Sequence, residues 1–438
     1  MVWRLESAFS RKTTFLWAIC VLIGLSTRSD QLGVTSIVRA LGLKNKSYEC
    51  LRQFFRSKAI NLGRLTKLWK EVVEELLDKQ LVRYNNRKVY LIDGIKVAKE
   101  GRRMAGVKWL FQSSQNSSKP SYIFGHSFQA LHILASVSEQ YVAVPLIMRI
   151  HEGLNDRRGS LVIRVLDFIY AIGIRNSYIV GDAYYWAGEL SKELRSRGNH
   201  LISRLKSTAV AYEEPPKSKG RGRPKIYGKK RKLKNFFIKN GFTKIQLFLY
   251  GKTESIEYKE RIFICKNHQC AVKYIFIKSS KGRCILASTD TELSAKEIIE
   301  IYSLRFKIEF SFKEFVHDFG GFTYRFWSKS IDRSRSKQVL KRNSRLEDAY
   351  HLYVQLAVIA QGTANILALK HSEEIWKVQS YWMRTIRPGV LPSAAVVRNT
   401  LKQELPIFLG LKKYSGNITK FIANRRRIDE YDDLAKAA

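Results

Sequence analysis

The chain has 438 residues, long enough for about two to four domains and at least one sizeable core. Hydrophobic residues make up 45% of it, so most of the chain should fold rather than stay disordered. Its 78 Lys and Arg residues against 38 Asp and Glu give a formal net charge of +40. A compact protein tolerates such self-repulsion best when a polyanion neutralises it, so nucleic acid and an anionic membrane surface are the partners to consider.

A membrane partner would need an anchor. The apolar run at residues 15–25 is well short of the roughly 20 residues that a spanning helix requires. Basic residues flank this run on both sides and no small-residue cleavage site follows, so we expect a buried helix rather than a signal peptide. The five cysteines form no paired framework, which fits the reducing cytoplasm. We therefore expect no membrane association, and nucleic acid is the better partner.

Residues 1–85 have a helical pattern. Two short apolar-periodic segments, 31–43 and 48–56, are separated by a glycine-containing turn. The second segment is basic and is expected to present Arg52 and Arg56 to solvent. This pattern suggests a helix-turn-helix DNA-binding domain, although an ordinary small helical bundle fits the composition equally well. The net charge favours DNA, so we expect both arginines to contact it.

Residues 86–200 change to a pattern of strands followed by strand-helix alternation. This order indicates a mixed α/β layer fold. Predicted strands occupy residues 89–97, 123–137, 141–150 and 177–182, and predicted helices occupy 160–170 and a segment ending near 197.

Residues 201–291 form a second β-rich region. Four strand-like runs, without an intervening helical period, predict an all-β insertion at residues 245–250, 261–265, 272–277 and 284–287. After it, the capping-box sequence at 294–297 should begin a long helix that reaches about residue 317 and belongs to a second core segment, 292–335. Residues 336–438 then have the pattern of a C-terminal helical region.

The most basic segment of the chain is the loop at 217–239. Its core is an Arg-Gly-Arg-Pro sequence at 221–224, in which glycine adds no bulk and proline stiffens the exit. Such a sequence suits insertion into a narrow minor groove, so Arg221, Arg223 and Lys225 are expected to contact DNA. The alternative is a solvated charged loop.

Two aspartates follow hydrophobic strands. Asp93 comes after Tyr-Leu-Ile, and Asp182 comes after Tyr-Ile-Val-Gly. A lone carboxylate at the end of a buried strand costs several kcal/mol unless something neutralises it, so two such sites in one chain favour a shared cation. The alternative is that each aspartate only caps the following turn or helix.

A third acid lies in the predicted long helix. Tyr302, Arg305 and Glu309 are spaced three and four residues apart, which places them on one helix face. Arg305 could then hold the Glu309 carboxylate in place. A surface ion pair would have the same spacing, but apolar neighbours such as Phe306 and Phe310 argue against that interpretation.

With these three acids in order, the sequence resembles the DDE transposases of bacterial insertion sequences. The resemblance is to the subgroup with a Tyr-x2-Arg-x3-Glu motif and a β-strand insertion before the last acid. Asp93, Asp182 and Glu309 match the first, second and third acids. The resemblance implies an α/β fold with a ribonuclease H-like mixed sheet, flanking helices and the all-β insertion. It also implies a bacterial protein that is cytoplasmic and associated with the nucleoid.

The resemblance further implies the chemistry. Asp93, Asp182 and Glu309 would bind two Mg²⁺ ions, roughly 3.5–4 Å apart, with Asp93 shared by both, and Mn²⁺ could substitute. Tyr302 and Arg305 would orient Glu309 and contact the scissile phosphate. Water would free a 3′-hydroxyl at the terminal inverted repeats of the element, and that hydroxyl would attack target DNA. The expected partner is double-stranded DNA, bound by a homodimer, with no small-molecule substrate.

Two departures from the family pattern matter. The lysine that usually stands seven residues after the glutamate is Val316 here, and Lys313 is the candidate to replace its phosphate contact. No tryptophan occurs between positions 186 and 327, so either another aromatic residue stacks on a flipped base or the hairpin step is absent. His126 and His132 are expected to be core or supporting residues. A non-catalytic DNA-binding descendant and a structure-specific nuclease remain the alternative functions.

Overall fold

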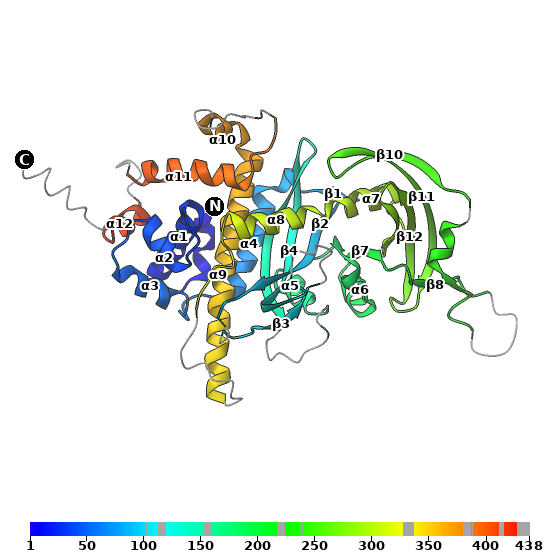
Figure 1. Cartoon of the computed structure of the whole chain (residues 1–438), viewed down its shortest axis with the longest axis horizontal. Helices are drawn as coiled ribbons and strands as arrows, with labels where there is room; N and C mark the ends of the chain where they lie inside the picture. The colour runs from blue at the N-terminus through cyan, green and yellow to red at the C-terminus, as the bar shows by residue number, and fades with distance from the viewer. Residues whose placement is uncertain are drawn as a thin grey trace, which may run out of the picture.

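One mixed β-sheet dominates the molecule, with helices packed mainly around one end of it (Figure 1). The computed structural model describes residues 1–101, 104–112, 120–152, 160, 162–216, 224–238, 240–326, 337–379, 387, 389–410 and 416–426. Within these residues the sheet has 13 strands. Large mixed sheets of this kind require helices on their faces to cover apolar side chains.

The central part of the sheet contains five strands in the order β5-β4-β2-β6-β7. β2 (Arg87–Ala98) pairs antiparallel with β4 (Tyr122–Val137), which pairs antiparallel with β5 (Gln140–Glu152). On its other side β2 pairs parallel with β6 (Ser177–Gly181), and β6 pairs parallel with β7 (His200–Leu205). The predicted strands at 89–97, 123–137, 141–150 and 177–182 are confirmed as β2, β4, β5 and β6.

The β-rich insertion continues the same sheet. β13 (Gly282–Ser288) pairs antiparallel with β7, and β12 (Cys270–Ser279) and β11 (Lys252–Cys265) follow outward, with β10 (Thr243–Leu249) on the edge of β11. These four strands match the four predicted ones, except that β10 ends at Leu249, one residue before the predicted end at 250. The shorter elements of the sheet region are β1 (Arg83–Tyr84), β3 (Lys108–Phe111), β8 (Val210–Tyr212), β9 (Lys230–Lys232) and the 3-10 helix η4 (Leu233–Phe237).

The N-terminal part is helical, as predicted. Its elements are η1 (Val2–Ala8), α1 (Lys12–Thr27), α2 (Val34–Ala40), α3 (Lys46–Phe54), α4 (Leu62–Leu76) and η2 (Asp78–Gln80). The apolar run at 15–25 lies inside α1, and all but one of its side chains are buried, so the expected buried helix is confirmed. α3 begins two residues earlier and ends two residues earlier than predicted, which leaves Arg56 just beyond the helix.

In the C-terminal part, α9 (Lys337–Lys370) packs against α1, α4 and strand β5 of the sheet. Gly362 allows this close packing because a Cβ atom there would lie 2.4 Å from the Trp69 ring of α4. Among the described helices, the segment Leu346–Lys370 of α9 is long and apolar enough to cross a membrane by length and composition alone, but 89% of its apolar window is buried inside the protein, as in a core helix. The remaining helices are α10 (Ser372–Gln379), α11 (Ala394–Gly410) and α12 (Asn417–Ala423).

Two helix predictions require correction. The helix expected at 160–170 is α5 (Val165–Ala171), which is followed by η3 (Ala183–Tyr185) and α6 (Gly188–Arg195). The long helix expected from the capping box to residue 317 is two helices, α7 (Ala295–Leu304) and α8 (Lys307–His317).

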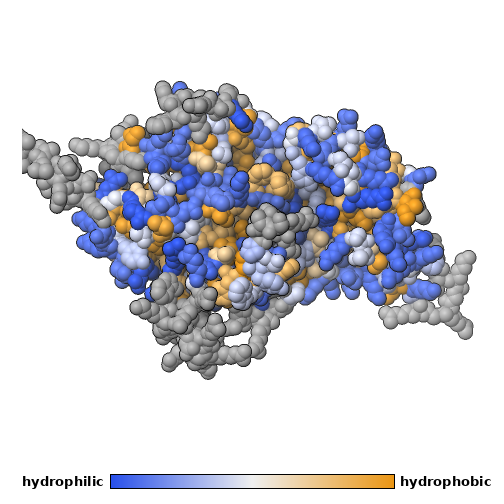
Figure 2. Space-filling model, viewed as in Figure 1, coloured by the Kyte–Doolittle hydropathy of each residue, from blue (hydrophilic) through white to orange (hydrophobic). Residues whose placement is uncertain are grey.

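The break between α7 and α8 has a backbone cause. The amides of Arg305, Ile308 and Glu309 each bond to a carbonyl three residues earlier, so the backbone forms a tighter turn between the two helices. The predicted capping box is confirmed, since the Ser294 and Glu297 side chains bond reciprocally to each other's backbone amides. Hydrophilic side chains cover most of the molecular face drawn in Figure 2.

Candidate active site

Two aspartates lie just beyond the point where the pairing between β2 and β6 ends. β2 and β6 are parallel neighbours, and Leu91 of β2 is paired with Val180 of β6. Continuing this register by two residues brings Asp93 opposite Asp182, and adjacent strands are separated by about 4.8 Å. The sheet therefore holds the two carboxylates side by side at the carboxyl end of β6.

The Asp93 carboxyl group is in an environment that disfavours its charge. Its side chain is 19% exposed, and one oxygen accepts a hydrogen bond of 2.8 Å from the Gly94 amide. Burial, opposed by Arg305 and reinforced by the nearby charges of Asp182 and Glu309, raises the pKa of Asp93 to about 6. A cation at this position would relieve both effects.

Asp182 also caps the turn that follows it. Its side chain accepts a hydrogen bond of 3.0 Å from the Tyr184 amide at the start of η3. The capping interpretation is therefore correct, and it coexists with the position beside Asp93. The next residue, Tyr185, packs behind the site against Gly181, where a Cβ atom would lie 2.9 Å from its ring.

Arg305 connects the first acid to the third. Its guanidinium donates to Asp93 at 2.7 Å and to Glu309 at 2.8 Å, and its side chain is only 17% exposed. Burial by itself would lower the pKa of Arg305, but Asp93, Tyr302 and Glu309 raise it overall, so the guanidinium remains charged. The bond to Glu309 was expected from the spacing. The bond to Asp93 was not, because it depends on the break between α7 and α8.

The neighbouring positions on α7 and α8 differ in exposure. Tyr302 is half-buried beside Arg305, and burial raises the pKa of its phenol. Lys313 is exposed one turn after Glu309, whereas Val316 packs against the hydrophobic core. A lysine at 316 would therefore point toward apolar side chains, and Lys313 is the cation on this stretch of α8 that faces solvent.

A cationic hollow lies next to Asp182. It has a volume of about 910 Å³ and is also lined by Tyr302 and Arg305. The sequence did not reveal it, because its charges come from β7, β13 and the segment around η4. Its other cationic side chains are Arg204, Lys206, Lys234 and Arg283. This arrangement provides hydrogen-bond donors for phosphate groups beside the acids.

The other predicted DNA contacts are separate from this cluster. Arg221 and Arg223 lie outside the described residues, and Lys225 is exposed. Arg52 on α3 is exposed and forms an ion pair of 3.2 Å with Glu49. Arg56 is exposed beyond the end of α3. No interaction within the described residues connects these cations to the three acids.

The two histidines of β4 are buried in the core. His126 bonds through one ring nitrogen to the Tyr324 hydroxyl and through the other to the Ala105 carbonyl, both at 2.7 Å. The His132 ring packs against Phe312. Burial lowers the pKa of His126 to about 4 and that of His132 to about 3, so both rings are neutral near pH 7.

The fold and the site together have the features of a nuclease-like enzyme: adjoining carboxylates at a sheet edge, bordered by cations that suit phosphate groups. The chain belongs to the DDE superfamily of endonucleases, because a model of the family described as DDE superfamily endonuclease matches residues 4–236, more than half of the sequence. The matched range includes Asp93 and Asp182 and ends before Glu309.

Among solved structures, the chain is similar to one described as a cryo-EM structure of a piggyBac transposase synaptic complex with hairpin DNA. The identity is 12%, the TM-score is 0.38, and the match covers 96% of this chain and 80% of that chain. No curated protein matches this chain.

Members of the DDE endonuclease superfamily generally use divalent metal ions. The carboxylates of Asp93, Asp182 and Glu309 are the hard oxygen donors that such ions require. Within the described residues, however, no group of three or more His, Cys, Asp or Glu side chains is gathered closely enough to hold a metal ion. The residues fit a metal in their chemistry, and in this structure Arg305 bonds to one oxygen of Asp93 and to one oxygen of Glu309.

Proposed function

We propose that this protein is a DDE transposase that cleaves DNA at the ends of a mobile element and joins those ends to target DNA. The observation that carries the proposal is the bond of one buried guanidinium to both Asp93 and Glu309, with Asp93 in register with Asp182. This convergence of three remote segments supports their use as one catalytic set. The ribonuclease H-like core that we propose is supported by the strand order β5-β4-β2-β6-β7.

We propose that Asp93, Asp182 and Glu309 hold two Mg²⁺ ions, for which Mn²⁺ can substitute. When bound, such ions lower the pKa of an attacking oxygen and stabilise the leaving oxygen of an in-line displacement. The chain's own residues position the substrate. Asp182 is fixed by its bond to the Tyr184 amide, and Tyr302 and Arg305 lie between the acids and the cationic hollow, where a scissile phosphate can be held.

The reaction follows from this arrangement. Water attacks the phosphorus at the element end, the 3′-oxygen leaves with a proton, and the freed 3′-hydroxyl attacks a phosphodiester of target DNA in the same way. Lys313, which is exposed on α8, is proposed to contact the flanking phosphate in place of a lysine at position 316. Two element ends must meet in one complex, so we propose a homodimer on DNA. The proposed setting is the bacterial cytoplasm and nucleoid.

The test is a cleavage assay on the inverted repeats that flank the coding sequence. The parent protein and the Asp182→Ala variant are incubated with labelled duplex and Mg²⁺, and a gel-shift assay measures binding in parallel. The matched control is Asp78→Asn, whose side chain is 69% exposed and pairs with Arg83 near the opposite end of β2. We expect cleavage by the parent and the control, and at least a hundredfold less by Asp182→Ala, with similar binding by all three.

The outcomes separate the alternatives. Cleavage that survives in Asp182→Ala would refute the catalytic assignment. A parent that binds the repeats but never cuts them would support a non-catalytic DNA-binding protein. A parent that cuts branched or unrelated DNA as well as the repeats, without joining ends, would support a structure-specific nuclease.

A further inference from the structure

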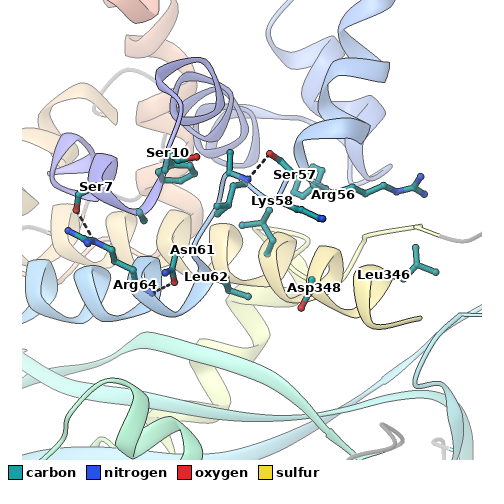
Figure 3. Close-up of a pocket in the computed structure, with 16 residues that line it drawn as sticks. Ser7, Ser10, Arg56, Ser57, Lys58, Asn61, Leu62, Arg64, Leu346 and Asp348 are labelled. Carbon is teal, nitrogen blue, oxygen red and sulfur yellow. Dashed lines mark hydrogen bonds between the residues drawn. The ribbon is translucent and has the colours of Figure 1, made fainter. Parts of the chain in front are cut away.

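A second large hollow lies in the helical N-terminal part of the protein, outside the acid cluster. Its volume is about 1260 Å³. Figure 3 shows it between the end of η1 and the connection from α3 to α4, with the α4 and α9 helices forming its floor. None of the residues that form the proposed catalytic site lines it.

The walls of this hollow, which we call the N-terminal groove, are joined by backbone hydrogen bonds. The Ser10 amide donates to the Ala59 carbonyl and the Asn61 amide donates to the Ala8 carbonyl, both at 2.9 Å. These bonds hold the segment after η1 against the α3–α4 connection. The Asn61 side chain in turn caps α4 through the Arg64 amide. The groove is therefore a fixed feature of the fold.

The polar half of the groove's lining carries a net positive charge. Three cations, Arg56, Lys58 and Arg64, line it together with one acid, Asp348. Figure 3 places Arg64 beside Ser7 at one end of the groove and Arg56 at the other, with Lys58 between them. All three cationic side chains belong to exposed residues. A row of cations along an open groove matches the repeated negative charge of a polynucleotide backbone.

The size and chemistry of the groove argue against a small apolar ligand. Pockets for small molecules usually enclose about 300–1,000 Å³ and are lined mostly by apolar side chains. This groove is larger, and polar or charged residues make up half of its lining. The groove also lies close in sequence to the exposed Arg52 of α3, because Arg56 follows Arg52 by four residues, just beyond the end of that helix.

We propose that the N-terminal groove holds the sugar-phosphate backbone of duplex DNA through Arg56, Lys58 and Arg64. This proposal rests on the proposed function, because it assigns part of the DNA contact of that same enzyme. The groove supplies sequence-independent affinity on DNA beside the segment that α3 contacts. It takes no part in the chemical step.

The test is the salt dependence of DNA binding. A triple variant, Arg56→Gln with Lys58→Gln and Arg64→Gln, is compared with the parent by fluorescence anisotropy on a mixed-sequence duplex of about 40 base pairs, in EDTA so that no cleavage occurs. The matched control removes three exposed lysines outside the groove, Lys79→Gln with Lys192→Gln and Lys296→Gln. Thermal melting shows whether each variant is folded.

Each phosphate contact contributes about 0.9 to the slope of log affinity against log salt, so the triple variant should lose up to about 2.7. When the salt concentration rises from about 50 to 200 mM, the affinity of the parent should therefore decrease by a factor roughly 40 times larger than that of the triple variant. The control should keep the parent slope. The single variant Lys58→Gln, at an exposed loop position, should lose about 0.9 even if the triple variant is unstable.

A parent slope in both the folded triple variant and Lys58→Gln would overturn the groove assignment while leaving the proposed function intact. A parent that shows no duplex binding at low salt would instead contradict the proposed function itself. An equal loss of slope in the control variant would show general electrostatics rather than a groove, and would also overturn the assignment.

Discussion

Replacement of Arg305 by glutamine should destabilise the protein in the absence of metal. Removal of one partner of a fully buried ion pair costs about 3–5 kcal/mol, because the other charge is left unpaired. Here the Asp93 side chain is 19% exposed and the Glu309 side chain is 45% exposed, so solvent replaces part of the lost interaction. We expect Arg305→Gln to lower the free energy of unfolding by about 2–3 kcal/mol at pH 8.

The pH dependence of this loss follows from the pKa of Asp93, which is raised from 3.8 to about 6 in the folded protein. Above pH 6 the carboxylate is ionised and Arg305 stabilises it. As the pH falls through 6 the Asp93 carboxylate takes up a proton, and Arg305 keeps only its pair with the more exposed Glu309, so the effect of Arg305→Gln should fall below about 1 kcal/mol at pH 5. In the parent, the raised pKa of Asp93 stabilises the folded protein at pH values below 3.8, which is the ordinary pKa of the group in the unfolded chain. This stabilisation is lost as the pH rises through about 6.

The measurement is urea denaturation of Arg305→Gln, Asp93→Asn and the double variant at pH 5 and pH 8 with a chelator present. The control is Arg83→Gln, whose partner Asp78 is largely exposed. A coupling energy of at least about 1 kcal/mol at pH 8 is expected from the double-mutant cycle. Additive effects at pH 8, or equal losses at the two pH values, would refute the proposed balance of buried charge.

Three further perturbations test the surroundings of the site and the core. Gly181→Ala should displace Tyr185 behind the aspartates, because the added Cβ would lie 2.9 Å from that ring. The free energy of unfolding in urea should fall by about 1–3 kcal/mol, and cleavage should be reduced. Unchanged stability would contradict this packing. Trp69→Ala should lower the free energy of unfolding by about 3–5 kcal/mol, because the indole is fully buried and donates to the Pro145 carbonyl at 3.0 Å. A loss below about 1 kcal/mol would show that neighbouring side chains fill the cavity. Burial raises the pKa of Glu347 to about 7, so stability falls as pH rises from about 4.5 through 7. Glu347→Gln should therefore add about 1–2 kcal/mol at pH 8 and nothing at pH 4, and equal effects at both pH values would exclude this cause.

The local elements of this protein could be predicted well from the sequence. β-branched and aromatic runs located β2, β4 and the strands of the insertion, because period-two and fully buried strands carry a strong apolar signal. The spacing of Arg305 and Glu309 also predicted their contact correctly. Such features depend on residues that are close in the chain.

The parts that could not be predicted depend on the path of the backbone in space. A continuous helix was the natural interpretation of residues 294–317, because neither proline nor a run of glycines marks the break at Arg305. The contact of Arg305 with Asp93 results from that break, across 212 positions of the chain. The cationic hollow beside Asp182 and the N-terminal groove likewise combine side chains from separate elements, each of which looks in sequence like an ordinary surface residue.

The insertion has a structural consequence for the proposed chemistry. Its last strand, β13, pairs with β7, the parallel neighbour of β6, so the chain returns to the central sheet before α7 begins. The capping box at Ser294 starts α7 shortly after β13, and ten helical residues later the turn at Arg305 reaches Asp93. The position of Glu309 is therefore set by the pairing of β13 with β7. A shift in the β13–β7 register should therefore move Arg305 and Glu309 away from both aspartates.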